Sequence, residues 1–136
     1  MYIKLTDFGF AKKYDPRKQE NLSLGSPLYM APELTLEKPY DSKVDIWATG
    51  AITFVLLSGQ PPFFDKSKRP SKQGIYDAIV SDEPDYTKIQ TSDQLVIDFL
   101  ERCLAKHSSQ RATVDELLNH PWIQNNIQAN ALDHQR

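Results

Sequence analysis

The sequence predicts a mainly α-helical domain that begins with one short β-strand. Residues Tyr2 to Thr6 alternate between apolar and polar side chains, as a half-buried strand does. An almost uninterrupted apolar run from Asp45 to Ser58 predicts a long helix, because Gly59 and the pair Pro61-Pro62 then stop it. Thr113 and Glu116 have the spacing of a capping box, which predicts a further helix start.

The predicted helix from Asp45 to Ser58 is apolar on almost all of its faces. A helix of this kind must be buried on every side, and the chain offers only modest helices and a loop to cover it. We therefore expect some packing partners of this helix to be supplied from elsewhere, either by a further N-terminal segment or by another protein.

Three shorter helices are expected. Gln73 to Ser81 is one candidate, and Thr91 followed by Gln94 predicts the start of another through a capping box. That second helix carries the apolar stripe Leu95, Val96, Phe99, Leu100, Cys103 and Leu104. The third begins at Thr113, runs through Leu118, and ends at His120-Pro121. We expect the polar residues 125–136 to form a frayed tail.

A loop of nearly thirty residues is predicted between Ala11 and Pro39. It contains Pro16, Gly25, Pro27 and Pro32 and shows no sustained period, so we expect no long helix or strand there. Loops of this length in a compact domain are uncommon and are usually functional or disordered. The segment is therefore either a functional loop or a tail.

Composition excludes several classes of protein. The net charge of -2 over 136 residues argues against a nucleic-acid partner or an anionic membrane held by bulk electrostatics. Cys103 is the single cysteine, so no internal disulfide is possible, and we expect an intracellular, cytoplasmic protein. We interpret Cys103 as a buried, inert thiol, with a reactive thiol as the alternative. The first residues lack a secretory pattern, and the longest apolar stretch, Ala48 to Leu57, is too short to span a membrane.

Four short motifs are ambiguous when each is taken alone. Asp7-Phe8-Gly9 fits any turn that carries an N-terminal carboxylate. Ala31-Pro32-Glu33 fits a helix start, with proline at the first position and an acid near the positive end of the helix dipole. Asp45-Ile46-Trp47 fits an acidic helix start followed by core, and Arg111 fits a solvated surface charge.

The order and spacing of these motifs resemble the activation segment and lower lobe of a protein kinase. Asp7-Phe8-Gly9, then residues 25–33 (GSPLYMAPE), then residues 45–50 (DIWATG) and finally Arg111 follow one another as in that family. The resemblance covers about residues 2 to 123. It implies the C-terminal helical lobe of the protein-kinase fold, with a short strand before the activation segment. The implied division is a partial kinase domain at 1–123, with activation segment 7–33 and helical lobe 34–123, followed by a polar tail at 124–136.

Further motifs indicate the group within the family. Residues 7–12 (DFGFAK), residues 56–63 (LLSGQPPF) and residues 120–123 (HPWI) resemble the calmodulin-dependent and calcium-dependent kinases. Residues 25–30 (GSPLYM) are also similar to the unc-51-like kinases. Ser26 stands where serine/threonine kinases carry a hydroxyl residue in the substrate-facing loop, so the resemblance implies serine or threonine acceptors on a protein substrate. Residues 124–136 contain one Lys or Arg, Arg136, so they do not support calmodulin binding.

The resemblance also implies roles for individual residues at the nucleotide side. Asp7 would bind the magnesium ion that bridges the phosphates of ATP, since a carboxylate is a hard oxygen ligand. Gly9 would allow the backbone to turn there, and Phe8 would pack inward and set the active or inactive geometry.

Other implied roles concern the substrate loop and the helical lobe. Pro27, Leu28 and Met30 would shape the pocket for the substrate residue after the acceptor, with simple loop packing as the alternative. Glu33 would form a buried ion pair with Arg111. Asp45, Trp47 and Gly50 would anchor the central helix, Asp45 by accepting backbone hydrogen bonds from a catalytic loop.

The regulatory position departs from the family. Related kinases often place the activating acceptor at the position of Leu22, which cannot be phosphorylated. Ser23 is adjacent and is the candidate phosphosite. Lys12, Lys13, Arg17 and Lys18 are possible counter-charges for its phosphate.

Several parts that phosphoryl transfer needs are not found in the 136 residues. No glycine-rich phosphate loop, third-strand lysine or His-Arg-Asp catalytic loop is present, and the three histidines have no metal-site spacing. The isolated chain is therefore expected not to transfer phosphate. Two readings remain open, a piece of a longer serine/threonine kinase or a short non-catalytic binding module derived from a kinase lobe.

Overall fold

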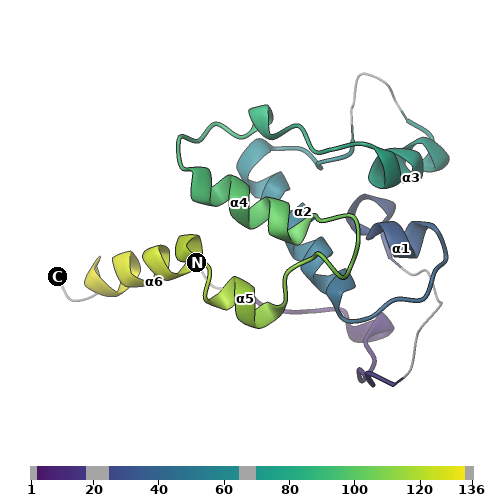
Figure 1. Cartoon of the computed structure of the whole chain (residues 1–136), viewed down its shortest axis with the longest axis horizontal. Coiled ribbons are helices and arrows are strands. Elements are labelled where there is room, and N and C mark those ends of the chain that lie inside the picture. The colour runs from purple at the N-terminus through teal and green to yellow at the C-terminus, as the bar shows by residue number, and fades with distance from the viewer. Residues whose placement is uncertain (1–2, 18–24, 65–69, 134–136) are drawn as a thin grey trace.

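The computed structural model describes residues 3–17, 25–64 and 70–133, and this part of the chain is mainly helical (Figure 1). The α-helices are α1 (Pro32–Thr35), α2 (Lys43–Ser58), α3 (Lys72–Ser81), α4 (Gln94–Cys103), α5 (Val114–Leu118) and α6 (Pro121–Asp133). Three short 3-10 helices are η1 (Phe8–Phe10), η2 (Pro27–Tyr29) and η4 (Tyr86–Lys88).

The core forms where α2 packs against α4, and Figure 1 shows these two helices crossing at the centre of the molecule. Trp47, Ala51 and Phe54 of α2 are fully buried there, as are Leu100 and Cys103 of α4. Gly50 allows the close approach, because a Cβ atom at this position would lie 2.5 Å from the Cβ of Cys103.

The long predicted helix is confirmed, and it begins two residues earlier than expected, at Lys43. It ends as predicted, because Gly59 adopts a left-handed φ of 78° and its N–H donates to the carbonyl of Val55. Only one side of α2 is covered within the described chain. Ile52 and Leu56 remain 50% and 72% exposed.

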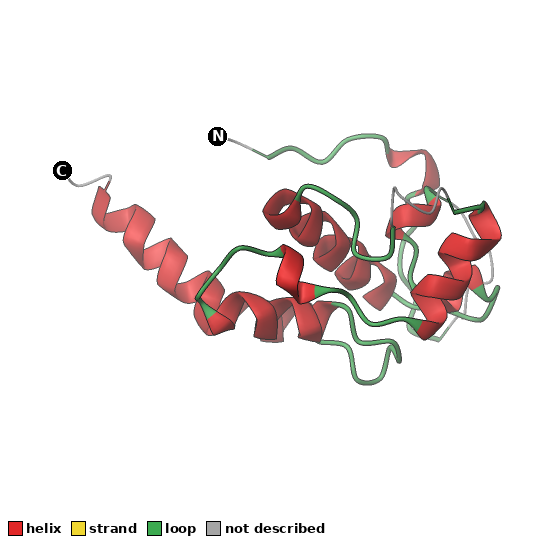
Figure 2. Ribbon diagram, turned by 90° about the horizontal axis from the view of Figure 1, so that it is seen from above, coloured by secondary structure: helices red, strands yellow, loops and turns green. Residues whose placement is uncertain are grey.

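The predicted strand at Tyr2–Thr6 is wrong for residues 3–6, which have no regular secondary structure. A strand needs a neighbour to accept its backbone hydrogen bonds, and no described segment pairs with these residues (Figure 2). The alternating pattern alone therefore does not produce a strand here.

The predicted capping boxes had different outcomes. At α5 the box is confirmed, since the Thr113 side chain accepts from the Glu116 N–H and the Glu116 carboxylate accepts from the Thr113 N–H. At α4 the predicted box of Thr91 and Gln94 is wrong. Asp93 is the N-cap and accepts from the Leu95 N–H, because a carboxylate at this position caps better than a threonine further upstream.

The expected frayed tail is also wrong for residues 125–133, which belong to α6. Pro121 ends the preceding segment as predicted, but it also occupies the first turn of a new helix, where its missing N–H costs nothing. The predicted boundary between residues 123 and 124 therefore falls inside α6. Both views show α6 extending away from the other helices (Figures 1 and 2).

Candidate functional site

The turn at Asp7-Phe8-Gly9 lies at the exposed edge of the molecule. Asp7 has a left-handed φ of 58° and precedes η1, so the sharp change of direction falls on Asp7 and not on Gly9. Aspartate is among the few residues other than glycine that tolerate this conformation. The expectation that Phe8 packs inward is wrong here. Phe8 is 67% exposed, because no described element covers residues 3–14.

A hollow of about 490 Å³ lies between this segment and the start of α2. Asp7, Lys12 and Lys13 line it from the segment, and Tyr29 and Asp45 line it from η2 and α2. Asp45 is exposed in the first turn of α2. The two predicted carboxylates, Asp7 and Asp45, thus border one hollow although 38 positions separate them in the sequence.

The loop from Ser26 to Met30 is held against the helical lobe. Pro27 starts the 3-10 turn η2, which contacts both α2 and α3. Ser26 is exposed, whereas Pro27 and Leu28 are half-buried and Met30 is buried. The Tyr76 hydroxyl of α3 lies 3.6 Å from the Met30 sulfur. The predicted phosphosite Ser23 lies outside the described residues.

The C-terminal end of segment 7–33 is tied to the helices by Glu33 and Arg111. Arg111 Nη1 lies 2.7 Å from Glu33 Oε1, and Arg111 Nη2 lies 3.0 Å from Glu33 Oε2, so the pair is bidentate. The Arg111 side chain is fully buried and that of Glu33 is 12% exposed. Pro32 begins α1 directly before Glu33, as predicted for a proline at the first helical position.

Arg111 also makes contacts that satisfy the rest of its guanidinium. It donates to the backbone carbonyls of Ala105 at 3.1 Å and of Lys43 at 2.9 Å. The guanidinium carbon lies 5.2 Å above the Trp47 ring, which in turn stacks on Phe63. A buried charge is tolerated at this point because every polar contact it needs is provided.

Two lysines near Arg111 also join distant parts of the chain, and the sequence pattern predicts neither contact. Lys43 donates from Nζ to the carbonyls of Ser108 and Arg111, at 2.9 and 2.7 Å, and fastens the start of α2 to the loop that carries Arg111. Lys106 donates to the carbonyl of Ile79 at 2.7 Å and lies 4.0 Å from the centre of the Phe63 ring. No sequence signal could have found these contacts, since their acceptors are backbone carbonyls far along the chain.

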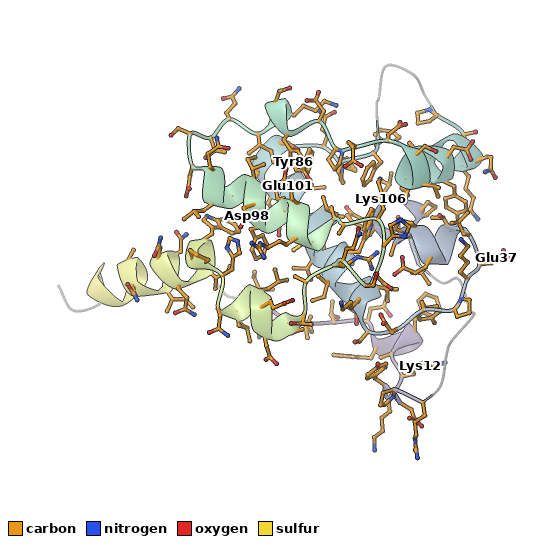
Figure 3. The ribbon with its side chains drawn as sticks, in the orientation of Figure 1. Lys12, Glu37, Tyr86, Asp98, Glu101 and Lys106 are labelled. Atoms are coloured by element: carbon orange, nitrogen blue, oxygen red, sulfur yellow. The ribbon has the colours of Figure 1, made fainter. Side chains whose placement is uncertain are left out.

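Burial changes the acidity of Lys106. Desolvation lowers its pKa to about 8, although nearby Glu83 and Asp82 act in the opposite direction. Figure 3 shows Lys106 between α3 and the core of the lobe. The amine therefore has a structural role at the junction of α3, α2 and the loop after α4.

The described residues do not bring together enough ligand side chains for a metal centre. Within 3–17, 25–64 and 70–133, no group of three or more His, Cys, Asp or Glu side chains could hold a metal ion. Asp7 supplies one oxygen donor of the kind that magnesium prefers. One carboxylate does not make a site, so the remaining ligands for a cation at Asp7 would have to come from outside these residues.

No described helix has the length and apolar character that a membrane-crossing segment requires.

The fold and site define a helical lobe to which a loop is anchored by a buried ion pair, and comparison with known proteins gives its class. The pattern of the protein kinase domain matches residues 1–123, so the chain belongs to the protein kinase family. Its relatives are serine/threonine kinases, and the chain covers only part of such a kinase domain.

Three relatives illustrate the match. The human SNF-related serine/threonine-protein kinase is 39% identical over 123 residues, 90% of this chain and 15% of the relative. The rat serine/threonine-protein kinase ULK3 is 35% identical over 122 residues, 90% of this chain and 25% of the relative. The Saccharomyces cerevisiae DNA damage response protein kinase DUN1 is 40% identical over 128 residues, 93% of this chain and 24% of the relative. The chain thus spans a quarter or less of each relative's length.

Proposed function

We propose that this chain provides the activation segment and the helical lobe of a serine/threonine kinase. Such a kinase transfers the γ-phosphoryl group of ATP to a protein substrate: a serine or threonine hydroxyl oxygen loses its proton and bonds to the γ-phosphorus, and the bond to the ADP oxygen breaks. We place the protein in the cytoplasm.

The observation that carries the proposal is the bidentate pair of Glu33 and Arg111. It holds the end of the segment 7–33 on the lobe, next to the loop Ser26–Met30. Positioning is the main contribution of a kinase to catalysis, because the protein does little covalent chemistry. A loop fixed between α2 and α3 is suited to orient a peptide substrate.

Asp7 is our candidate ligand for Mg²⁺. Its carboxylate is exposed and borders the hollow that Asp45 also lines, so it is accessible to a ligand. When bound, Mg²⁺-ATP supplies the phosphoryl group and neutralises its charge. Gly9 belongs to the same turn as Asp7. The other residues of the site hold the substrate loop and the end of segment 7–33 in place.

The proposed substrate-binding surface is formed by Ser26, Pro27, Leu28 and Met30. Because Met30 is buried and Leu28 half-buried, the loop presents a formed surface and not a free strand of chain. We propose that this surface receives the residue after the acceptor. Regulation through phosphorylated Ser23 is a further part of the proposal. Peptide mass spectrometry of the native protein in its active state tests it, and an unmodified peptide spanning Ser23 would contradict it.

The first experiment is magnesium-ATP binding and turnover by the purified 136-residue chain, with Asp7→Ala as its control. We expect neither binding nor turnover, since one carboxylate cannot position the nucleotide. Turnover that disappears with Asp7→Ala would mean that a dimer or partner completes the site, and the expected inactivity of the isolated chain would be wrong.

The exposed side of α2 favours a second candidate, a non-catalytic binding module. Ile52, Leu56 and Leu57 are 50%, 72% and 39% exposed on one helix, and apolar side chains gathered in this way commonly mark an interface. Either the rest of a kinase or another protein would cover them. An antibody against residues 124–136 separates the two, because a larger band in cells supports the kinase and a band of 15.6 kDa alone supports the module.

A further inference from the structure

The side chain of His120 connects three helices at the far end of the lobe. It lies between α5 and α6 and is only 4% exposed. Its Nε2 is 2.8 Å from Asp98 Oδ2 on α4, and its Nδ1 accepts a hydrogen bond of 3.2 Å from the Trp122 N–H in the first turn of α6. Figure 3 shows Asp98 on the side of α4 that faces the start of α6.

These two contacts determine the tautomer of the neutral ring. Because Nδ1 accepts from a backbone N–H, it carries no proton in this arrangement. The proton of the neutral imidazole is therefore on Nε2, where it is donated to the Asp98 carboxylate. His120 thus acts as the side-chain N-cap of α6, a position that usually holds Ser, Thr, Asp or Asn.

Histidine differs from those residues because an imidazole ring can take up a proton in mildly acidic solution, whereas a hydroxyl or an amide cannot. Protonation would place a hydrogen on Nδ1, opposite the Trp122 N–H and the positive end of the α6 dipole. The cap hydrogen bond would then be lost. We propose that His120 is a proton-sensitive cap, which holds the start of α6 on the lobe as neutral imidazole and releases it when Nδ1 is protonated.

Among the described side chains, the other contacts that hold α6 also lie in its first turn, where Gln124 Nε2 donates to the Leu118 carbonyl at 2.6 Å. Trp122 packs on Phe99 of α4 with ring centres 4.9 Å apart, and Ile123 is partly buried. From Asn125 to Ala129 the side chains are exposed. Release at His120 would therefore loosen α6 while the core of α2 and α4 stays intact.

The charged groups around the ring are few and have defined positions. On α4, Asp98 contacts the ring and is itself bound at 3.0 Å by Arg102. On α5, Asp115 and Glu116 are exposed, and Glu116 is engaged with Thr113. The first turn of α6 has no acidic residue. The Asp98 carboxylate can accept from Nε2 in either protonation state of the ring, whereas the hydrogen bond from the Trp122 N–H is the one that protonation removes.

The test is amide hydrogen exchange by NMR on the 136-residue chain, at about pH 7.5 and about pH 5, the range in which histidine changes charge. The readout is the protection factor of the Trp122 amide relative to that of Phe54 in the core of α2, so that global unfolding cancels. In the wild-type chain we expect this ratio to fall about fivefold to tenfold on acidification, the effect of losing one side-chain cap.

Two substitutions separate the contacts of the ring. His120→Asn places an amide oxygen where Nδ1 accepts and cannot titrate, so its ratio should stay high at both pH values. His120→Gln reaches toward Asp98 as Nε2 does but lacks the cap acceptor, so its ratio should be low at both. All three proteins keep the other two histidines, so any effect of those residues is common to the three. A wild-type ratio that is unchanged or rises at low pH, or an equal fall in His120→Asn, would overturn the proposal.

Discussion

Glu33 and Arg111 are 78 positions apart in the sequence, and two hydrogen bonds of 2.7 and 3.0 Å join them in a nearly solvent-free setting. Replacing Arg111 with Ala should lower the free energy of unfolding by about 3 to 5 kcal/mol, because the Glu33 carboxylate is then left without its buried partner. Urea unfolding of both proteins measures this difference.

Arg102 provides the matched control for Arg111. It also pairs with a carboxylate at 3.0 Å, Asp98, but both side chains are about half exposed, at 54% and 43%. Replacing Arg102 with Ala should therefore cost no more than about 1 kcal/mol. Equal losses from Arg111→Ala and Arg102→Ala would show that burial does not make the Glu33 pair special.

A substitution at Gly50 tests the contact between α2 and α4. An added Cβ would lie 2.5 Å from the Cβ of Cys103 and 3.1 Å from Leu104, so Gly50→Ala should force the helices apart and cost about 1 to 3 kcal/mol. In α3, a Cβ at Gly74 meets nothing closer than 3.5 Å, and Gly74→Ala should instead stabilise by about 0.5 to 1 kcal/mol. Thermal unfolding should give opposite signs, and two shifts of the same sign would contradict the packing.

Much of the helical lobe could be predicted from local sequence signals, and the exceptions depend on distant contacts. The end of α2 follows from Gly59, and the starts of α3 and α5 follow from the N-cap residues Ser71 and Thr113, whose effects are local. The helix α6 was missed because its sequence is polar. Its start is held by His120 and by Trp122 packing on Phe99 of α4, which no local pattern reveals.

The candidate site shows the same division. The pairing of Glu33 with Arg111 was expected from a family resemblance and not from any spacing between them. The exposure of Phe8 was not anticipated, because it depends on which elements cover the segment. Lys43 binds backbone carbonyls 65 and 68 positions away, and Lys106 binds one 27 positions away. The identity of a side chain does not encode such distant contacts.

Glu37 offers a stabilising substitution. It has a left-handed φ of 53° two positions after Thr35, the last residue of α1, and the N–H of Lys38 donates to the carbonyl of Glu33 there. Glycine adopts this conformation without the steric cost, so Glu37→Gly should raise the free energy of unfolding by about 1 kcal/mol. Glu37→Ala keeps the cost and should change little. A loss of stability with Glu37→Gly would contradict the assigned conformation.

Cys103 should be chemically inert in the folded chain. It is fully buried, and desolvation raises its pKa to about 12, so the nucleophilic thiolate does not form near neutral pH. Because the folded pKa lies above the ordinary value of 9.0, the thiol's contribution to stability is complete below pH 9.0 and is lost as the pH rises toward about 12. Iodoacetamide labelling at neutral pH should occur only in urea, and rapid labelling without urea would show that α2 and α4 do not pack as described.

The central claim is that residues 2–123 form a working activation segment and helical lobe of a serine/threonine kinase. Its most direct test replaces the matching region of the human SNF-related serine/threonine-protein kinase with these residues, in a chimaera whose folding is checked by its melting transition. We expect the chimaera to phosphorylate a serine peptide, and Asp7→Asn to reduce the rate at least about a hundredfold, the usual effect of removing one preorganised electrostatic group. A folded chimaera that transfers no phosphate, or one that is unaffected by Asp7→Asn, would contradict the claim.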